Sequence, residues 1–74
     1  MRYVFRSKVG TFSIESDEVH WDMVQLCLGG LWLRTVETAE EAARFVYEQK
    51  TGLHEWDTLT EIEAPSDLSG WETI

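Results

Sequence analysis

A pair of apolar runs separated by two glycines constrains the fold of this chain more than any other feature. The runs cover residues 24–28 and 31–36, and Gly29-Gly30 lies between them. A Gly-Gly pair supplies the positive φ angles that two-residue hairpin turns require. The pattern therefore predicts a β-hairpin in which Leu28 pairs with Leu31 across the turn.

A capped helix is predicted directly after this hairpin. Thr38 stands three residues before Glu41, which is the spacing of a capping box, and the helix is predicted to span Ala39 to Lys50. At about 100° per residue, small apolar side chains form one narrow stripe along this helix. The stripe consists of Ala39, Ala42, Ala43 and Val46. We expect the stripe to lie closely against one face of the sheet.

The two-residue turn also predicts which side chains of the hairpin share a face. Regular alternation away from the turn pairs Leu26 with Leu33 and Val24 with Thr35 on an aliphatic face. The opposite face is predicted to mix aromatic and polar side chains: Trp21, Met23, Gln25, Cys27, Trp32, Arg34 and Val36. Because the first face is aliphatic, we expect the helix to cover it and to leave the opposite face uncovered.

A further strand upstream completes the predicted sheet. Residues 10–14 alternate between polar and apolar side chains, which is the period of a half-buried strand, and a polar turn over 15–18 follows. The next strand is predicted from His20 to Leu28. The predicted fold is α+β, a three-stranded antiparallel sheet with one helix packed on one face, in the order β-β-β-α.

The chain is long enough for one domain with one small core, because it has 74 residues. We assign the β-β-β-α core to residues 1–52. From residue 53 to residue 74, apolar side chains are scattered among acidic ones, and Pro65 and Gly70 interrupt any periodicity. This segment is predicted to be an irregular, acidic C-terminal strap that packs on or near the core.

The charge of the chain disfavours nucleic-acid and membrane partners. The formal net charge is -8, and residues 53–74 contain six acidic residues and no Lys or Arg. Such a surface repels phosphate backbones and anionic lipids. No apolar run approaches the roughly 18 residues of a membrane span, and charges occupy the N-terminal positions where a signal peptide needs apolar residues. We therefore expect a cytoplasmic protein.

No set of residues predicts catalysis, a metal or a cofactor. The two histidines, His20 and His54, lie far apart in the sequence, whereas a zinc site needs three or four ligands. Cys27 has no basic residue close in sequence to lower its pKa, so it is interpreted as a small apolar filler. The chain also lacks a Ser-His-Asp arrangement, a P-loop and a dinucleotide fingerprint. We expect no enzyme activity, no cofactor, no metal and no small-molecule ligand.

One segment of the chain resembles a known DNA-binding family. Residues 31–43, together with Tyr47, resemble the strand-to-helix segment of the plant ethylene-response-factor DNA-binding domain. That resemblance implies three antiparallel strands and one helix. The family has Gly where this chain has Arg34, and the DNA-contacting arginines of its first two strands have no counterpart here. Only Trp32 matches a DNA-facing position of the family.

More of the chain is similar to small uncharacterised bacterial proteins of about this length. The residues that carry this similarity are spread widely: Gly10-Thr11-Phe12-Ser13-Ile14, Trp32-Leu33, Thr38, Ala42-Ala43, Thr51-Gly52, Trp56-Asp57, Pro65 and Trp71. The similarity implies the same fold and no activity.

Two functions are compatible with these features. The first is a non-enzymatic protein-interaction module that uses the sheet face opposite the helix to bind a protein partner or a second copy. Its candidate residues are Trp21, Met23, Gln25, Trp32 and Arg34. An uncovered face with Trp, Met and Arg is typical of an interface.

A structural alternative to this partner site is that the C-terminal strap buries that same face with its apolar residues, which are Trp56, Leu59, Ile62 and Trp71.

The second function is a diverged nucleic-acid-binding domain of ethylene-response-factor-like fold. Its contacts would come from Arg2, Arg6, Lys8, Trp32 and Arg34.

Overall fold

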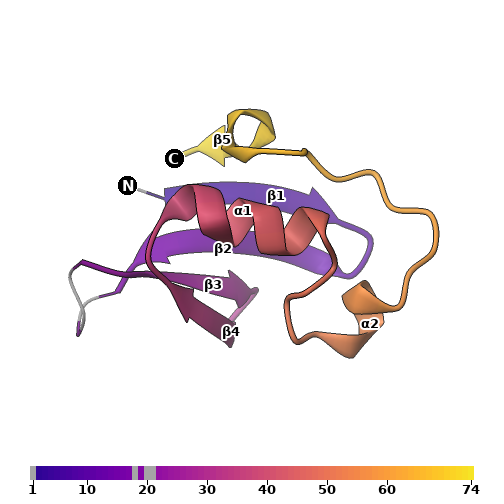
Figure 1. The fold of residues 1–74 in the computed structure, drawn as a ribbon, viewed down its shortest axis with the longest axis horizontal. Coiled ribbons are helices and arrows are strands. Elements are labelled where there is room, and N and C mark those ends of the chain that lie inside the picture. Colours follow the sequence, from indigo (N-terminus) through magenta and orange to yellow (C-terminus); the bar gives the residue numbers. More distant parts are fainter. Residues whose placement is uncertain (1, 18, 20–21) are drawn as a thin grey trace.

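The sheet has five strands, so the predicted three-stranded β-β-β-α arrangement is wrong. The computed structural model describes residues 2–17, 19 and 22–74, and its strands form one antiparallel sheet in the order β4-β3-β2-β1-β5 (Figure 1). The fold is α+β. The strands are β1 (Arg2–Ser7), β2 (Gly10–Ser16), β3 (Val24–Leu28), β4 (Leu31–Val36) and β5 (Glu72–Thr73). The helices are α1 (Ala39–Tyr47), α2 (His54–Asp57) and the short 3-10 turn η1 (Leu68–Gly70).

The two additional strands, β1 and β5, carry weak sequence signals. In β1, Tyr3 and Phe5 lie on the side of the sheet that carries α1, whereas Arg2, Val4 and Arg6 lie on the other side. This alternation has the period of a strand, but arginines occupy solvent-facing positions, so few apolar residues remain to indicate a strand. β5 is two residues long, too short for any periodic pattern, and it forms by pairing with β1.

The predicted register of the β3–β4 hairpin holds beside the turn and fails beyond it. A β-bulge leaves Leu33 without a partner, so that Arg34 opposes Leu26 and Val36 opposes Val24. One extra residue transfers every later side chain of the strand to the other face. Arg34 and Val36 therefore lie on the α1 side, which corrects their predicted place on the opposite face. Leu33 keeps its predicted place against the core. The bulge brings Val36 into the core on the α1 side and moves Thr35 from its predicted place there to the opposite face.

The helix α1 begins where the sequence predicts and ends earlier. The hydroxyl of Thr38 accepts the backbone N–H of Glu41 at 3.1 Å, which confirms the predicted cap. The helix ends at Tyr47 instead of Lys50, because Gln49 adopts a left-handed backbone with a φ of 58°. A left-handed residue just after a helix ends its hydrogen-bond ladder.

Side chains of α1 and of the strap cover neighbouring parts of one face of the sheet. α1 lies over β2, β3 and β4, while the strap, residues 53–74, runs round the end of the sheet and along its β1 edge (Figure 1). The strap packs its apolar side chains against the same core. Trp56 and Trp71 are only 2% and 6% exposed. The ring of Trp56 meets that of Phe12 at 5.1 Å, and Trp71 meets Phe5 at 5.6 Å between centroids. The apolar side chains of the strap thus complete the core and do not cover the opposite face of the sheet.

Candidate functional site

The sheet face opposite α1 is the surface on which the sequence analysis placed a partner site, and we call it the open face. The strand register assigns eleven side chains to it: Arg2, Val4, Arg6, Thr11, Ser13, Glu15, Gln25, Cys27, Trp32, Thr35 and Glu72. Central side chains such as Val4, Ser13 and Cys27 are buried. They lie in register between longer side chains on the same face, so the face is closely packed along its middle row.

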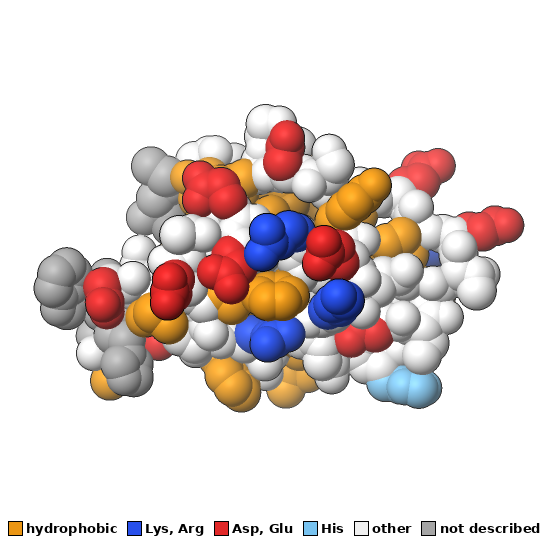
Figure 2. All heavy atoms as spheres, in the orientation of Figure 1, with side chains coloured by type: hydrophobic (Ala, Val, Ile, Leu, Met, Phe, Trp, Pro, Cys, Tyr) orange, Lys and Arg blue, Asp and Glu red, His pale blue; other side chains and the backbone are white. Residues whose placement is uncertain are grey.

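The charges of the open face are paired. The guanidinium of Arg2 lies 3.4 Å from the carboxylate of Glu15, and that of Arg6 lies 2.9 Å from Glu72, which sits beside Val4 in β5. These are the only charged strand residues assigned to the open face within the described part of the chain. The net charge of -8 is therefore carried elsewhere. Figure 2 shows acidic side chains spread over the side of the molecule that carries α1.

Trp32 is the large apolar side chain that the open face presents to solvent. Its side chain is 58% exposed, and its indole N–H donates to the hydroxyl of Thr35 at 3.0 Å. Residues three apart lie on opposite faces of a regular strand, but the bulge at Leu33 brings these two side chains to the same face. The hydrogen bond restrains the indole before any partner arrives.

The other predicted site residues are distributed over both faces. Gln25 lies on the open face between Glu15 and Thr35, while Met23 is half-buried just before β3. Arg34 lies on the α1 side, where its guanidinium stacks 4.2 Å from the ring centre of Phe45. The predicted position of Trp21 falls outside the described residues. The structure therefore groups Gln25 with Trp32 and separates Arg34 from both.

The ion-paired residues of β1 and β2 are among the members of the open face that the sequence pattern did not predict there, as are Val4 and Thr35. From the sequence, Arg2 and Arg6 are predicted only as N-terminal cations of the alternative nucleic-acid surface. Their alternation with Tyr3 and Phe5 is the signal that places both arginines on one face of a strand.

Cys27 lies on the open face, but its thiol is not activated. Burial raises the pKa of its thiol, and the nearby carboxylate of Glu15 raises it further, while the charge of Arg2 acts in the opposite direction. The thiolate is the reactive form of cysteine. Cys27 is therefore protonated near neutral pH, in agreement with its interpretation as a buried filler.

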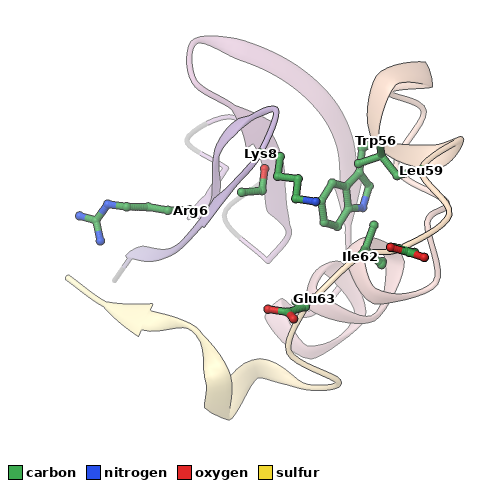
Figure 3. Close-up of a pocket in the computed structure, with 8 residues that line it drawn as sticks. Arg6, Lys8, Trp56, Leu59, Ile62 and Glu63 are labelled. Atoms are coloured by element: carbon green, nitrogen blue, oxygen red, sulfur yellow. The ribbon is translucent and has the colours of Figure 1, made fainter.

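A pocket, which we call the strap pocket, lies between the end of β1 and the strap (Figure 3). Its volume is about 580 Å³, and it is lined by Arg6, Ser7, Lys8, Trp56, Leu59, Glu61, Ile62 and Glu63. In Figure 3, Lys8 extends toward the indole of Trp56, whereas Arg6 extends away from it. No local pattern indicates this pocket, because its two walls are about fifty residues apart in the chain.

In the described part of the chain, no three His, Cys, Asp or Glu side chains are grouped so that they could hold a metal ion. Nor does any described helix have the length and apolar character needed to cross a membrane. No protein-family model, curated protein or solved structure matches this chain. The open face and the strap pocket are the two candidate sites.

Proposed function

We propose that this protein is a non-enzymatic protein-interaction module that binds a protein partner through the open face, with Trp32 as its anchor. The observation that carries the proposal is the exposed and hydrogen-bonded indole of Trp32 on a surface whose charges are paired. Aromatic and arginine side chains are enriched at protein interfaces, and tryptophan is prominent among their energetic hot spots.

The restraint on Trp32 favours binding. Because its indole is already held by Thr35, less side-chain freedom is lost when a partner covers it. β4 is also the outermost strand on its side of the sheet, so its outer edge pairs with no described strand. Such an edge offers backbone hydrogen-bonding groups to another chain.

The distribution of charge supports a protein partner over a nucleic acid. Arg2 and Arg6 are engaged in ion pairs with Glu15 and Glu72. Arg34 lies on the other side of the sheet from Trp32 and stacks on Phe45. Of the cations named for a nucleic-acid surface, Arg2, Arg6 and Arg34 are therefore engaged within the fold, which leaves Lys8. The chain as a whole carries a net charge of -8.

The test compares partner capture by three purified forms of the protein. Wild type, Trp32→Ala and Tyr47→Ala are used as baits in a lysate of the source organism. Tyr47 is the matched control, because it is a large side chain that is 49% exposed on α1. A protein captured by wild type and Tyr47→Ala but lost with Trp32→Ala is then purified and titrated against all three.

We expect Trp32→Ala to weaken that binding by about 2 kcal/mol, as for an interface hot spot, and Tyr47→Ala to leave it unchanged. Equal capture of every protein by all three baits would contradict the proposal. So would a purified partner whose affinity is insensitive to Trp32→Ala.

A further inference from the structure

The outer edge of β1 is only partly paired. β5 pairs with Tyr3 and Val4, and the N–H of Ile74 donates to the carbonyl of Arg2 at 2.7 Å. In an antiparallel strand, alternate residues direct their backbone groups to the same neighbour. The backbone N–H and carbonyl of Arg6 therefore point outward as those of Arg2 do, but no described strand pairs with them.

The strap pocket lies directly beside this unpaired stretch. Arg6 and Ser7 line one wall, and the apolar side chains of Trp56, Leu59 and Ile62 line the other. Its volume of about 580 Å³ is that of a typical ligand pocket. A strand added to the edge of β1 would direct every second side chain to the same face of the sheet. One of these side chains can enter the pocket.

The far wall of the pocket is held in place before any ligand binds. The side-chain amide of Gln49 donates to the backbone carbonyls of Trp56 and Leu59, at 2.9 and 2.6 Å. The indole N–H of Trp56 donates to the carbonyl of Val46 at 2.9 Å. These bonds connect the strap to the end of α1, so the wall requires little ordering on binding.

The charges around the pocket favour a positively charged ligand. Glu61 and Glu63 line it, are exposed, and form no ion pair within the described residues. Of the two cations on the opposite wall, Arg6 is already paired with Glu72, which leaves Lys8. The strap as a whole has six acidic residues and no basic one. Electrostatic complementarity therefore favours Lys or Arg in a ligand over Asp or Glu.

From these observations we infer that the free edge of β1 and the strap pocket together form a second docking site, distinct from the open face, for an extended peptide segment of another protein. The segment adds a strand beside Arg6, inserts an apolar side chain against Trp56 and Ile62, and carries Lys or Arg residues that lie near Glu61 and Glu63. Strand addition of this kind takes affinity from main-chain hydrogen bonds and specificity from side-chain pockets.

The inference is tested with a capped peptide of sequence Lys-Val-Lys-Phe-Lys-Val, titrated into the isotopically labelled full chain and followed by amide NMR. Two control peptides carry Glu in place of each Lys, or N-methyl groups at alternate residues. We expect saturable shifts centred on the amides of Arg6 and Ser7 and on the indole of Trp56. The Glu peptide and the methylated peptide should produce much smaller shifts at the same concentration.

A pair of double variants tests the charge argument. Glu61→Gln with Glu63→Gln should weaken binding of the lysine peptide by roughly three- to tenfold, as expected for two exposed ion pairs. Glu40→Gln with Glu48→Gln, which removes the same charge from exposed positions on and beside α1, should change it less than twofold. Three results would overturn the inference: no saturable shifts, shifts centred on Trp32, or equal effects of the two double variants.

Discussion

At the scale of single residues, the bulge at Leu33 decides what each side of β4 presents. It brings Thr35 to the open face, where its hydroxyl accepts the indole N–H of Trp32 at 3.0 Å. It also sends Arg34 to the other side, where the guanidinium stacks on Phe45 and donates to the carbonyl of Lys50 at 2.9 Å. Arg34 therefore connects β4 to the end of α1 and has a structural role.

This role predicts that Arg34→Ala destabilises the fold. Loss of the stacking contact and of the hydrogen bond should lower the free energy of unfolding by about 1–2 kcal/mol in urea denaturation. Arg44→Ala is the control, because Arg44 is an exposed cation on α1 and should cost less than about 0.5 kcal/mol. Equal effects of the two variants would contradict the structural role.

The buried thiol of Cys27 makes a prediction about pH. Because the folded-state pKa is raised, the folded protein holds this proton more tightly than the unfolded chain does. The resulting stability is fully present below the ordinary thiol pKa of about 8.5 and is lost as pH rises through the folded-state value. Urea unfolding between pH 7 and the alkaline range (about 10) should show wild type losing more stability than Cys27→Ala. Parallel pH profiles would contradict it.

At the scale of elements, the sequence predicts best those turns and helix ends that are determined by residues close together in the chain. The hairpin at Gly29-Gly30 and the start of α1 at Thr38 depend on neighbouring residues, and both are present. The bulge and β5 depend on contacts between distant parts of the chain, so no local pattern indicates them. Likewise, a pattern of scattered apolar residues in the strap does not reveal which face of the sheet they cover.

The end of α1 shows how a distant contact overrides a local pattern. Gln49 adopts a φ of 58°, a region that favours glycine, while its side chain bonds the carbonyls of Trp56 and Leu59. Gln49→Ala should therefore lose these bonds and retain the backbone strain, whereas Gln49→Gly should lose the bonds and relieve the strain. We expect Gln49→Gly to be the more stable variant by about 1 kcal/mol in thermal or urea unfolding. The reverse order would show that the left-handed backbone is not maintained in solution.

At the scale of the whole molecule, the tryptophans of the strap and of the hairpin have different roles. Trp56 and Trp71 close the core on the α1 side, and Trp32 remains 58% exposed on the open face. One side of the sheet is therefore a complete core, and the other is a surface with paired charges and a single large exposed aromatic side chain among its assigned strand residues. This division underlies the proposed partner site.

Urea denaturation of Trp32→Ala beside Trp56→Ala tests this division most directly. Trp56 is buried against Phe12 and donates to the carbonyl of Val46, so its removal should lower the free energy of unfolding by about 3–5 kcal/mol. Removal of the exposed Trp32 side chain should cost less than about 1 kcal/mol. A loss for Trp32→Ala as large as that for Trp56→Ala would show that Trp32 belongs to the core, and it would contradict the account of the open face.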